Sequence, residues 1–213
     1  MTKINQNKNN VDIPKYWDQK YINNEAGWDL GTPTPIIKQW AQNLSSRKSI
    51  CVLGAGNGWD AMCLAELGHD VTAVDFSKVA VENMKKISSA KEICIDIVYD
   101  NIFNLDKFFL NSFDIVFEYT CFCAINPKRR IDYVNLVYKI LKPSGQFVAL
   151  FFPLIDGPVS NGPPFSVNLK KTEELFNKYF KIIKRDIPKL SISPREDKEI
   201  FIIMKKNENN YKN

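Results

Sequence analysis

The sequence predicts an α/β fold with a doubly wound, mostly parallel sheet of seven strands. Three observations predict it. Five short apolar, β-rich runs alternate with helical patterns, a glycine-rich segment joins the first run to a helix, and two further apolar runs lie close together near the C-terminus. Because the runs are apolar almost throughout, we expect strands that are buried on both faces by helices.

The five runs expected to form the parallel strands are residues 50–54, 70–75, 93–98, 113–119 and 145–152. Between them, apolar residues recur three or four positions apart over 60–67, 77–87 and 131–141. Pro143 stops the last of these patterns, since proline cannot continue a helix.

The last third of the chain departs from simple alternation. A helix over 169–179 is followed by apolar runs at 181–187 and 199–206, with a proline-containing connector between them. Two strands that close together suggest a hairpin, which would place an antiparallel C-terminal strand in the sheet.

The chain of 213 residues is long enough for one sizeable core and too short for two full domains. We therefore expect a single domain over 13–206, of which 13–47 forms an N-terminal helical cap. The flanking segments 1–12 and 207–213 are rich in Asn and Lys and are expected to be mobile tails.

Composition argues against several classes of partner. The net charge of +5 is spread along the chain without the interleaved aromatic residues of a nucleic-acid platform, so no nucleic-acid partner is expected. The N-terminus lacks the apolar core of a secretory signal, and no apolar run approaches the roughly 20 residues of a membrane span. These features favour a cytoplasmic protein without membrane contact, a monomer or weak homodimer, acting on a small molecule.

Metal ligands are scarce. The five cysteines mostly lie in apolar runs, where a free thiol packs as a small hydrophobic group. The single histidine, His69, lies in a connector and is expected to be a surface turn residue. We predict no metal site.

The strongest chemical signal is the loop with Gly54, Gly56 and Gly58, which follows an apolar strand and opens a helix. Asp75 ends the next strand, where a carboxylate can accept hydrogen bonds from both hydroxyls of a ribose. Loop and acid together predict an adenosine-containing cofactor, although they could also serve only as a turn and a helix cap. A nicotinamide dehydrogenase is the main alternative, but only about 60 residues follow the fifth strand, too few for its usual substrate domain.

Four further segments carry a family resemblance: residues 28–35 (WDLGTPTP), 119–125 (YTCFCAI), 141–145 (LKPSG) and 162–167 (GPPFSV). With them, the sequence resembles the class I methyltransferases, which have a Rossmann-like fold. Within that class it is similar to the thiopurine methyltransferase-like family, in particular its plant-type thiol and halide branch. The resemblance runs from about Tyr16 to the last strand.

The resemblance implies that S-adenosyl-L-methionine is the cofactor and S-adenosyl-L-homocysteine its product. The residues at which it and the glycine loop predict cofactor contacts are Trp17, Tyr21, Trp28, Gly54, Gly56, Gly58, Asp60, Asp75, Phe76, Asp100, Asn101, Ile102 and Tyr119. Aromatic rings suit the positively charged sulfonium. Asp60 could instead be an ordinary first-turn helix acid, and Asp100 could make a turn.

The resemblance also places apolar groups around the methyl acceptor. The candidates for this pocket are Phe122, Cys123, Arg130, Phe152 and Phe165. Core packing is the alternative for the apolar ones, and a solvated surface charge is the favoured alternative for Arg130. Phe165 stands where plant relatives have a tyrosine, and Asn126 where an acid is common, so both departures bear on the acceptor.

Methyl transfer by direct displacement needs orientation and no covalent intermediate. The resemblance implies a thiol, sulfide or halide as the acceptor. The single histidine of the chain agrees with an acceptor that needs no strong base. The alternatives are an aromatic thiol of the thiopurine kind, and a non-catalytic protein that binds the cofactor as a partner or sensor. The loop 157–167, rich in Gly and Pro, could cover the site and favours an enzyme.

Overall fold

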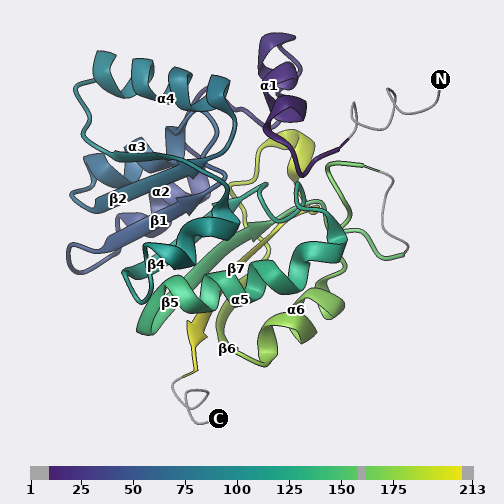
Figure 1. Cartoon of the computed structure of the whole chain (residues 1–213). Coiled ribbons are helices and arrows are strands. Elements are labelled where there is room, and N and C mark those ends of the chain that lie inside the picture. The colour runs from purple at the N-terminus through teal and green to yellow at the C-terminus, as the bar shows by residue number, and fades with distance from the viewer. Residues whose placement is uncertain (1–9, 158–161, 208–213) are drawn as a thin grey trace, which may run out of the picture.

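Seven strands form one mixed sheet in the computed structural model of the protein, which describes residues 10–157 and 162–207 (Figure 1). Their order across the sheet is β3-β2-β1-β4-β5-β7-β6. In chain order the strands are β1 (Ser49–Leu53), β2 (Asp70–Asp75), β3 (Asp96–Tyr99), β4 (Phe113–Tyr119), β5 (Leu141–Phe151), β6 (Phe180–Asp186) and β7 (Ile200–Lys206). The first five are parallel, and β7 lies antiparallel between β5 and β6, which confirms the predicted fold class and hairpin.

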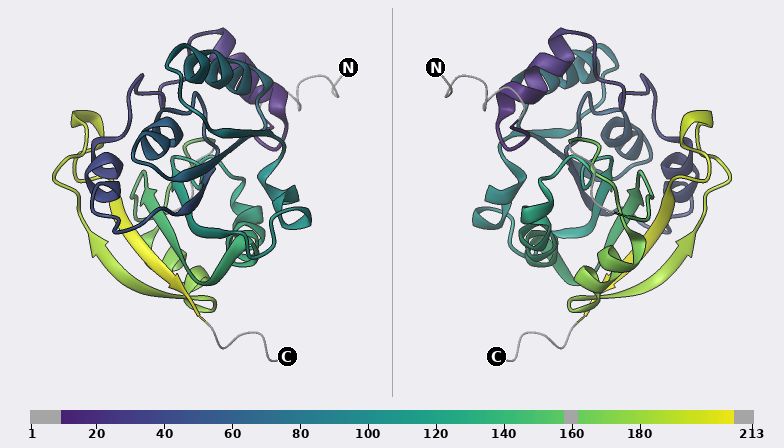
Figure 2. Two further views of the ribbon diagram at one scale, coloured as in Figure 1. Left: turned by 90° about the vertical axis from the view of Figure 1, so that its left-hand side faces the viewer. Right: turned by 90° about the vertical axis from the view of Figure 1, so that its right-hand side faces the viewer.

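Helices cover both faces of the sheet (Figures 1 and 2). The α-helices are α1 (Pro14–Ile22), α2 (Pro35–Ala41), α3 (Trp59–Glu66), α4 (Lys78–Ala90), α5 (Arg130–Ile140) and α6 (Leu169–Asn177), and the short 3-10 helices are η1 (Ile102–Lys107), η2 (Pro127–Arg129) and η3 (Ser193–Arg195). Alternate residues of a strand point to opposite faces. In β1, Ile50 and Val52 accordingly pack with α2 and α3, whereas Cys51 and Leu53 pack with α5.

Two strands differ from their predicted bounds by more than one residue. The third begins at Asp96 instead of residue 93, because it is an edge strand that pairs only with the last four residues of β2. The fifth begins earlier, at Leu141, so that the predicted LKPSG turn lies inside β5. There the register against β4 shifts between Phe113 and Ile115, and Ser144 has a φ of +59°.

The N-terminal cap lies against α4 at the carboxyl ends of the strands (Figure 1). Within the predicted tail 1–12, Val11 is buried and Asp12 accepts a hydrogen bond from Asn126 Nδ2 at 3.0 Å. Residues 1–9 of that tail, and residues 208–213 of the other, lie outside the described residues.

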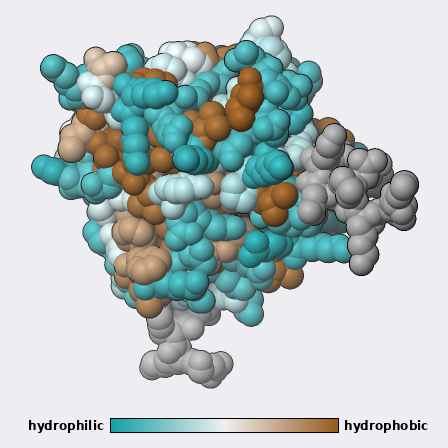
Figure 3. Space-filling view, turned by 45° about the horizontal axis from the view of Figure 1, so that its top comes forward, coloured by the Kyte–Doolittle hydropathy of each residue, from teal (hydrophilic) through white to brown (hydrophobic). Residues whose placement is uncertain are grey.

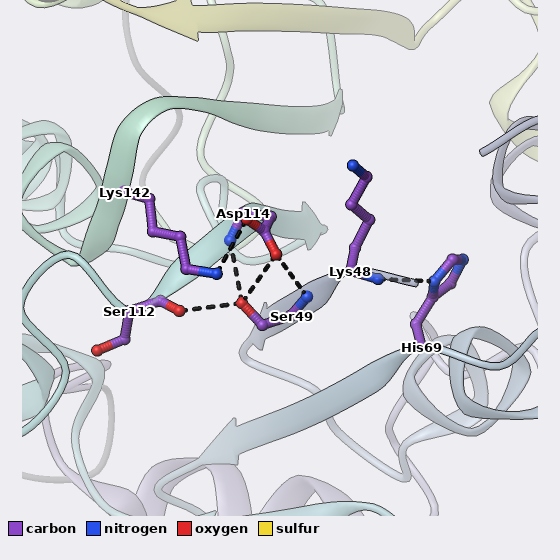
Figure 4. Close-up of polar contacts among 6 residues, drawn as sticks. All are labelled: Lys48, Ser49, His69, Ser112, Asp114 and Lys142. Carbon is purple, nitrogen blue, oxygen red and sulfur yellow. Dashed lines mark hydrogen bonds and ion pairs between the residues drawn. The ribbon is translucent and has the colours of Figure 1, made fainter. Parts of the chain in front are cut away.

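The opposite edge of the sheet, at the amino ends of the strands, carries a polar cluster (Figure 4). Asp114 accepts hydrogen bonds from Ser49 N at 2.8 Å and from Lys142 Nζ at 2.9 Å. His69 lies beside it and is buried, with its Nδ1 accepting a hydrogen bond from Lys48 N, so its prediction as a surface residue is wrong. Burial lowers the pKa of the His69 imidazole, because desolvation disfavours its charged form.

The molecular surface over the cap is mixed, with hydrophobic side chains lying between hydrophilic ones (Figure 3). Within residues 10–157 and 162–207, no helix is long and apolar enough to cross a membrane.

Candidate cofactor and acceptor site

A cavity of about 460 Å³ lies at the carboxyl ends of the parallel strands, under the N-terminal cap. This is the place where an open α/β sheet binds ligands, because the chain turns away in opposite directions after adjacent strands. Of the residues predicted to contact the cofactor, those on its wall are Trp17, Tyr21, Trp28, Gly54, Asp75, Phe76, Asn101 and Ile102. Segments separated by up to 85 residues in the sequence therefore meet at this cavity.

A smaller cavity of about 60 Å³ adjoins the first one beside the glycine loop. Gly56, Asp60 and Tyr119 lie on its wall. The two cavities share Tyr21, Trp28, Gly54 and Thr120, which together mark the junction between them.

The glycine loop needs glycine for two physical reasons. Gly54 and Gly56 have φ values of +60° and +57°, which side-chain-bearing residues rarely adopt. A Cβ atom at Gly54 would lie 2.9 Å from Cys121 Sγ, and one at Gly56 would lie 2.9 Å from the Tyr21 hydroxyl. The loop backbone is thus in close contact with the turn after β4 and with the cap.

Asp75 holds the loop in place. Its carboxylate accepts hydrogen bonds from Gly56 N and from Ser77 N, both at 2.8 Å. Since two carboxylate oxygens together offer about four lone pairs, the group can also accept from a ribose hydroxyl. The side chain is buried, and burial raises its pKa to about 6 despite these N–H bonds.

Three aromatic rings of the cap form one wall of the cavity. Trp28 packs edge-to-face on both Trp17 and Tyr21, with ring centroids 5.4 and 5.7 Å apart. Trp28 Nε1 donates to the Tyr21 hydroxyl at 3.1 Å, and Trp17 Nε1 donates to Val11 O at 2.9 Å, so both indoles are fixed. Fixed ring faces of this kind suit a bound sulfonium cation.

Two acids fasten the cap to the glycine loop. Asp29 accepts hydrogen bonds from the side chains of Asn57 and Trp59, the latter at 2.8 Å. Asp60, at the start of α3, accepts from Thr34 N at 2.7 Å and from Thr34 Oγ1 at 3.0 Å. Asp60 therefore already has a structural partner, while it also faces the smaller cavity.

Gly58 and Asp100 are the predicted cofactor residues that line neither cavity. Gly58 precedes α3 with a φ of +82° and packs against Met84. Asp100 accepts hydrogen bonds from Asn101 N and Asn104 Nδ2, at 2.6 and 2.8 Å, and so closes the turn that presents Asn101 to the cavity. Both residues therefore support the backbone around the site without lining either cavity.

The acceptor candidates divide into two groups. Cys123 and Phe152 line the main cavity, next to Pro163 and Pro164 of the predicted covering loop, whose residues 158–161 lie outside the described part. Phe122 is instead a core residue that packs on Tyr133, and neither Phe165 nor Arg130 is on the cavity wall.

The favoured interpretation of Arg130 as a solvated charge is wrong. Its guanidinium is buried over the Phe122 ring, 4.6 Å from the centroid, and Nη2 donates to Ser166 O at 3.2 Å. Arg130 therefore fixes the covering loop behind the cavity, because its long side chain reaches inward from the start of α5.

Arg195 is the cavity residue that the sequence analysis missed. It is only 5% exposed, lies across the rings of Tyr119 and Phe152, and donates from Nη2 to Trp28 O at 3.2 Å. Within the part of the chain that the structure describes, its Nη1 is buried without a hydrogen-bond partner. Nothing in the pattern around residue 195 distinguishes this arginine from a surface charge; only the hairpin of β6 and β7 brings it to the site.

This arrangement, a glycine loop with an acid after the next strand and a cap of fixed aromatic rings, agrees with the family comparison. Residues 13–207 match the thiopurine S-methyltransferase family. The chain belongs to this family. As a member, it is an S-adenosylmethionine-dependent methyltransferase, which confirms the predicted cofactor and reaction class.

Curated relatives cover most of the chain. It is 31% identical over 188 residues to a probable thiol methyltransferase 2 of Arabidopsis thaliana, spanning 86% of this chain and 81% of the relative. It is 28% identical to thiocyanate methyltransferase 1 of Brassica oleracea, with the same coverage of both chains. A thiopurine S-methyltransferase of Acinetobacter baylyi is 27% identical, over 79% of this chain and 85% of the relative.

Solved structures share the fold at lower sequence identity. The 1,6-didemethyltoxoflavin-N1-methyltransferase of Burkholderia thailandensis, solved with S-adenosylhomocysteine, has a TM-score of 0.76 at 18% identity. The match covers 91% of this chain and 87% of that one. The class I methyltransferase fold is therefore shown.

Proposed function

We propose that the protein transfers the methyl group of S-adenosylmethionine to a small, soft anion: a thiolate, hydrosulfide, thiocyanate or halide. The names of its relatives support thiol and thiocyanate acceptors. We further expect it to act in the cytoplasm as a monomer or weak homodimer, as the sequence suggests.

The donor half of the site follows from the residues around the glycine loop. Asp75 has free lone pairs for the ribose, Asn101 and Ile102 offer a pocket for the adenine, and Trp17 and Trp28 present ring faces to the charged sulfur. Bound in this way, the cofactor supplies an electrophilic methyl group on a positively charged sulfur. The protein's contribution is to hold that end of the cofactor toward the acceptor half of the cavity.

One observation carries the choice of acceptor: the cavity wall beyond the donor residues combines soft, apolar groups with a single buried guanidinium. Cys123 and Phe152 are the soft, apolar groups, and Arg195 carries the buried guanidinium. An anionic acceptor in this cavity would gain from the positive charge of Arg195, whose side chain is held on the wall by its hydrogen bond to Trp28 O. A soft, weakly hydrated anion loses little on entering an apolar wall.

The site does not need to deprotonate such an acceptor. Halides and thiocyanate carry no proton to remove, and thiols are partly ionised near neutral pH. The chain's only histidine, His69, lies at the opposite edge of the sheet. Burial raises the pKa of the Cys123 thiol, which stays protonated and therefore does not compete for the methyl group.

An aromatic thiol is the second candidate acceptor, because a thiopurine S-methyltransferase is among the relatives of this chain. A purified-protein screen decides between the two. With S-adenosylmethionine as donor, we expect methylation of hydrosulfide, methanethiol, thiocyanate or iodide at higher kcat/KM than of a heterocyclic aromatic thiol. Donor binding without transfer to any of these acceptors would contradict the proposal and favour a non-catalytic role.

Arg195 variants test the anion contact directly. Arg195→Ala should raise the KM for iodide or hydrosulfide roughly tenfold or more, since a hydrogen bond to a charged group is worth about 1.5 to 3 kcal/mol, while the donor Kd stays near wild type. Arg195→Lys keeps the charge, and its KM for these acceptors should lie between the values of the wild type and of Arg195→Ala. The control is Arg185→Ala, which removes an exposed arginine on β6 that pairs with Glu173. An unchanged acceptor KM in a folded Arg195→Ala protein would exclude this contact.

A further inference from the structure

Thr120, the residue after β4, has a backbone conformation that is unfavourable for its type. Its φ is +60°, and the described residues other than glycine with positive φ are Asn24, Glu92, Asn111, Thr120, Ser144 and Asp197. Asn and Asp tolerate this region, and Thr120 is the one β-branched residue of the set. Branching at Cβ makes the left-handed conformation a strained one, and such strain is usually found at functional sites.

Several contacts of the turn maintain this conformation. Glu118, buried at the end of β4, accepts hydrogen bonds through Oε2 from Cys121 N at 3.0 Å and Phe122 N at 2.9 Å. The Thr120 hydroxyl donates to Tyr119 O at 2.6 Å, and Cys123 Sγ donates to Thr120 O at 3.3 Å. The chain reverses so tightly that Cys121 lies on Gly54, where no Cβ would fit.

Thr120 lies where the two cavities of the site meet. Thr120 lines both cavities, at the junction that it shares with Gly54, Tyr21 and Trp28. Three positions later the same turn contributes Cys123 to the acceptor wall. A single strained residue thus lies between the groups proposed for the donor and those proposed for the acceptor.

We propose that Thr120 is a positioning residue of methyl transfer: the turn built on Glu118 keeps its side chain at the junction of the two cavities, where it sets the alignment of a small acceptor with the donor's methyl group. This inference rests on the proposed function. In-line displacement is sensitive to such alignment, since a shift of about 1 Å can cost a hundredfold in rate.

The test separates strain from catalysis by using glycine, which adopts a positive φ freely. Thr120→Gly should fold with an unfolding midpoint equal to or above that of wild type, because the strain is relieved. Its kcat for a small acceptor should nevertheless fall roughly ten- to a hundredfold, with a nearly unchanged donor Kd by calorimetry. The matched control is Glu92→Gly, which changes an exposed left-handed residue, with a φ of +54°, between α4 and β3. It should leave kcat unchanged.

A second variant controls for the greater backbone flexibility that glycine introduces in Thr120→Gly. Thr120→Asn keeps a residue that tolerates the left-handed conformation but replaces the branched side chain. It should fold like wild type and shift the preference between iodide and the larger methanethiol. A kcat within twofold of wild type in Thr120→Gly, together with an unchanged acceptor preference in Thr120→Asn, would overturn the inference. Failure of the wild type to methylate any acceptor would instead overturn the proposed function, so the two failures are distinguishable.

Discussion

At the scale of single residues, Asp75 connects the fold to the cofactor. One carboxylate oxygen accepts from the glycine loop and the other from the start of α4, so the groups that shape the loop also leave lone pairs free for ligand. Because the carboxylate is buried, its pKa is about 6, and the acceptor form needed by a ribose prevails only above that pH.

We expect Asp75→Ala to lose donor affinity by roughly a hundredfold or more, since two hydrogen bonds to a charged group are removed. Calorimetry with S-adenosylhomocysteine measures it, and circular dichroism checks that the protein is folded. Asp70→Ala is the control at the other end of the same strand, where Asp70 is exposed and pairs with Arg47. Retained donor binding in Asp75→Ala would show that the acid serves only the loop.

At the scale of elements, the N-terminal cap depends on hydrogen bonds between its acids and the helices of the domain. Asp18, on α1, accepts from Ser77 Oγ at 2.7 Å and from Val79 N at 3.2 Å at the first turn of α4. Ser77 in turn accepts from Ala80 N, so one chain of hydrogen bonds caps α4 and docks α1. The aromatic wall of the cavity is carried by this docked segment.

Asp18→Ala should therefore lower the free energy of unfolding by about 1 kcal/mol, the usual value of a helix cap. It should also speed amide exchange in residues 14–22 and weaken donor binding, because Trp17 and Tyr21 lie on the same helix. Hydrogen exchange followed by mass spectrometry measures the amide exchange in residues 14–22. The control is Glu82→Ala, which removes an exposed acid from α4. It should change neither the amide exchange of α1 nor donor binding. Wild-type exchange over α1 would contradict this role.

At the scale of the whole molecule, a chain with net charge +5 has three acids near the site whose pKa values are raised by burial. Burial raises the pKa of Asp60 and Asp75 to about 6 and that of Glu118 from 4.5 to about 7, even though backbone N–H groups and Arg130 favour the charged form of Glu118. A raised pKa means that the folded state binds more protons than the unfolded state between the two values. These groups therefore reduce stability as the pH rises from about 4.5 to 7.

The prediction is clearest for Glu118→Gln, since a glutamine oxygen can still accept from Cys121 N and Phe122 N. The free energy of unfolding of this variant relative to wild type should increase by about 2 kcal/mol between pH 5 and pH 8, because the variant has no carboxyl group to ionise. Urea denaturation at several pH values measures it. A difference that is constant over this range would show that the Glu118 pKa is close to its ordinary value.

The extent of sequence-based prediction differs between the two halves of the site. Gly54, Gly56 and Asp75 were predictable because a strand, a tight loop and a helix follow one another in the chain, and the next strand adds the acid. Arg195 and Thr120 were not, since an arginine before a strand and a threonine after one are unremarkable locally. Arg130 and His69 were misjudged for the same reason, because hydrophilic residues are usually exposed and their burial depends on distant neighbours.

The sequence by itself thus determined the fold class and the order of strands and helices, and it predicted the residues of the proposed donor half of the site. All of these depend on periodicity and on contiguous motifs. Only the tertiary structure decided the acceptor half. The turn after β4, the proline-containing loop and the hairpin of β6 and β7 come from separate parts of the chain, and their packing buries one arginine and strains one threonine at a shared cavity. Burial and strain are properties of neighbours in space, and local sequence patterns do not encode them.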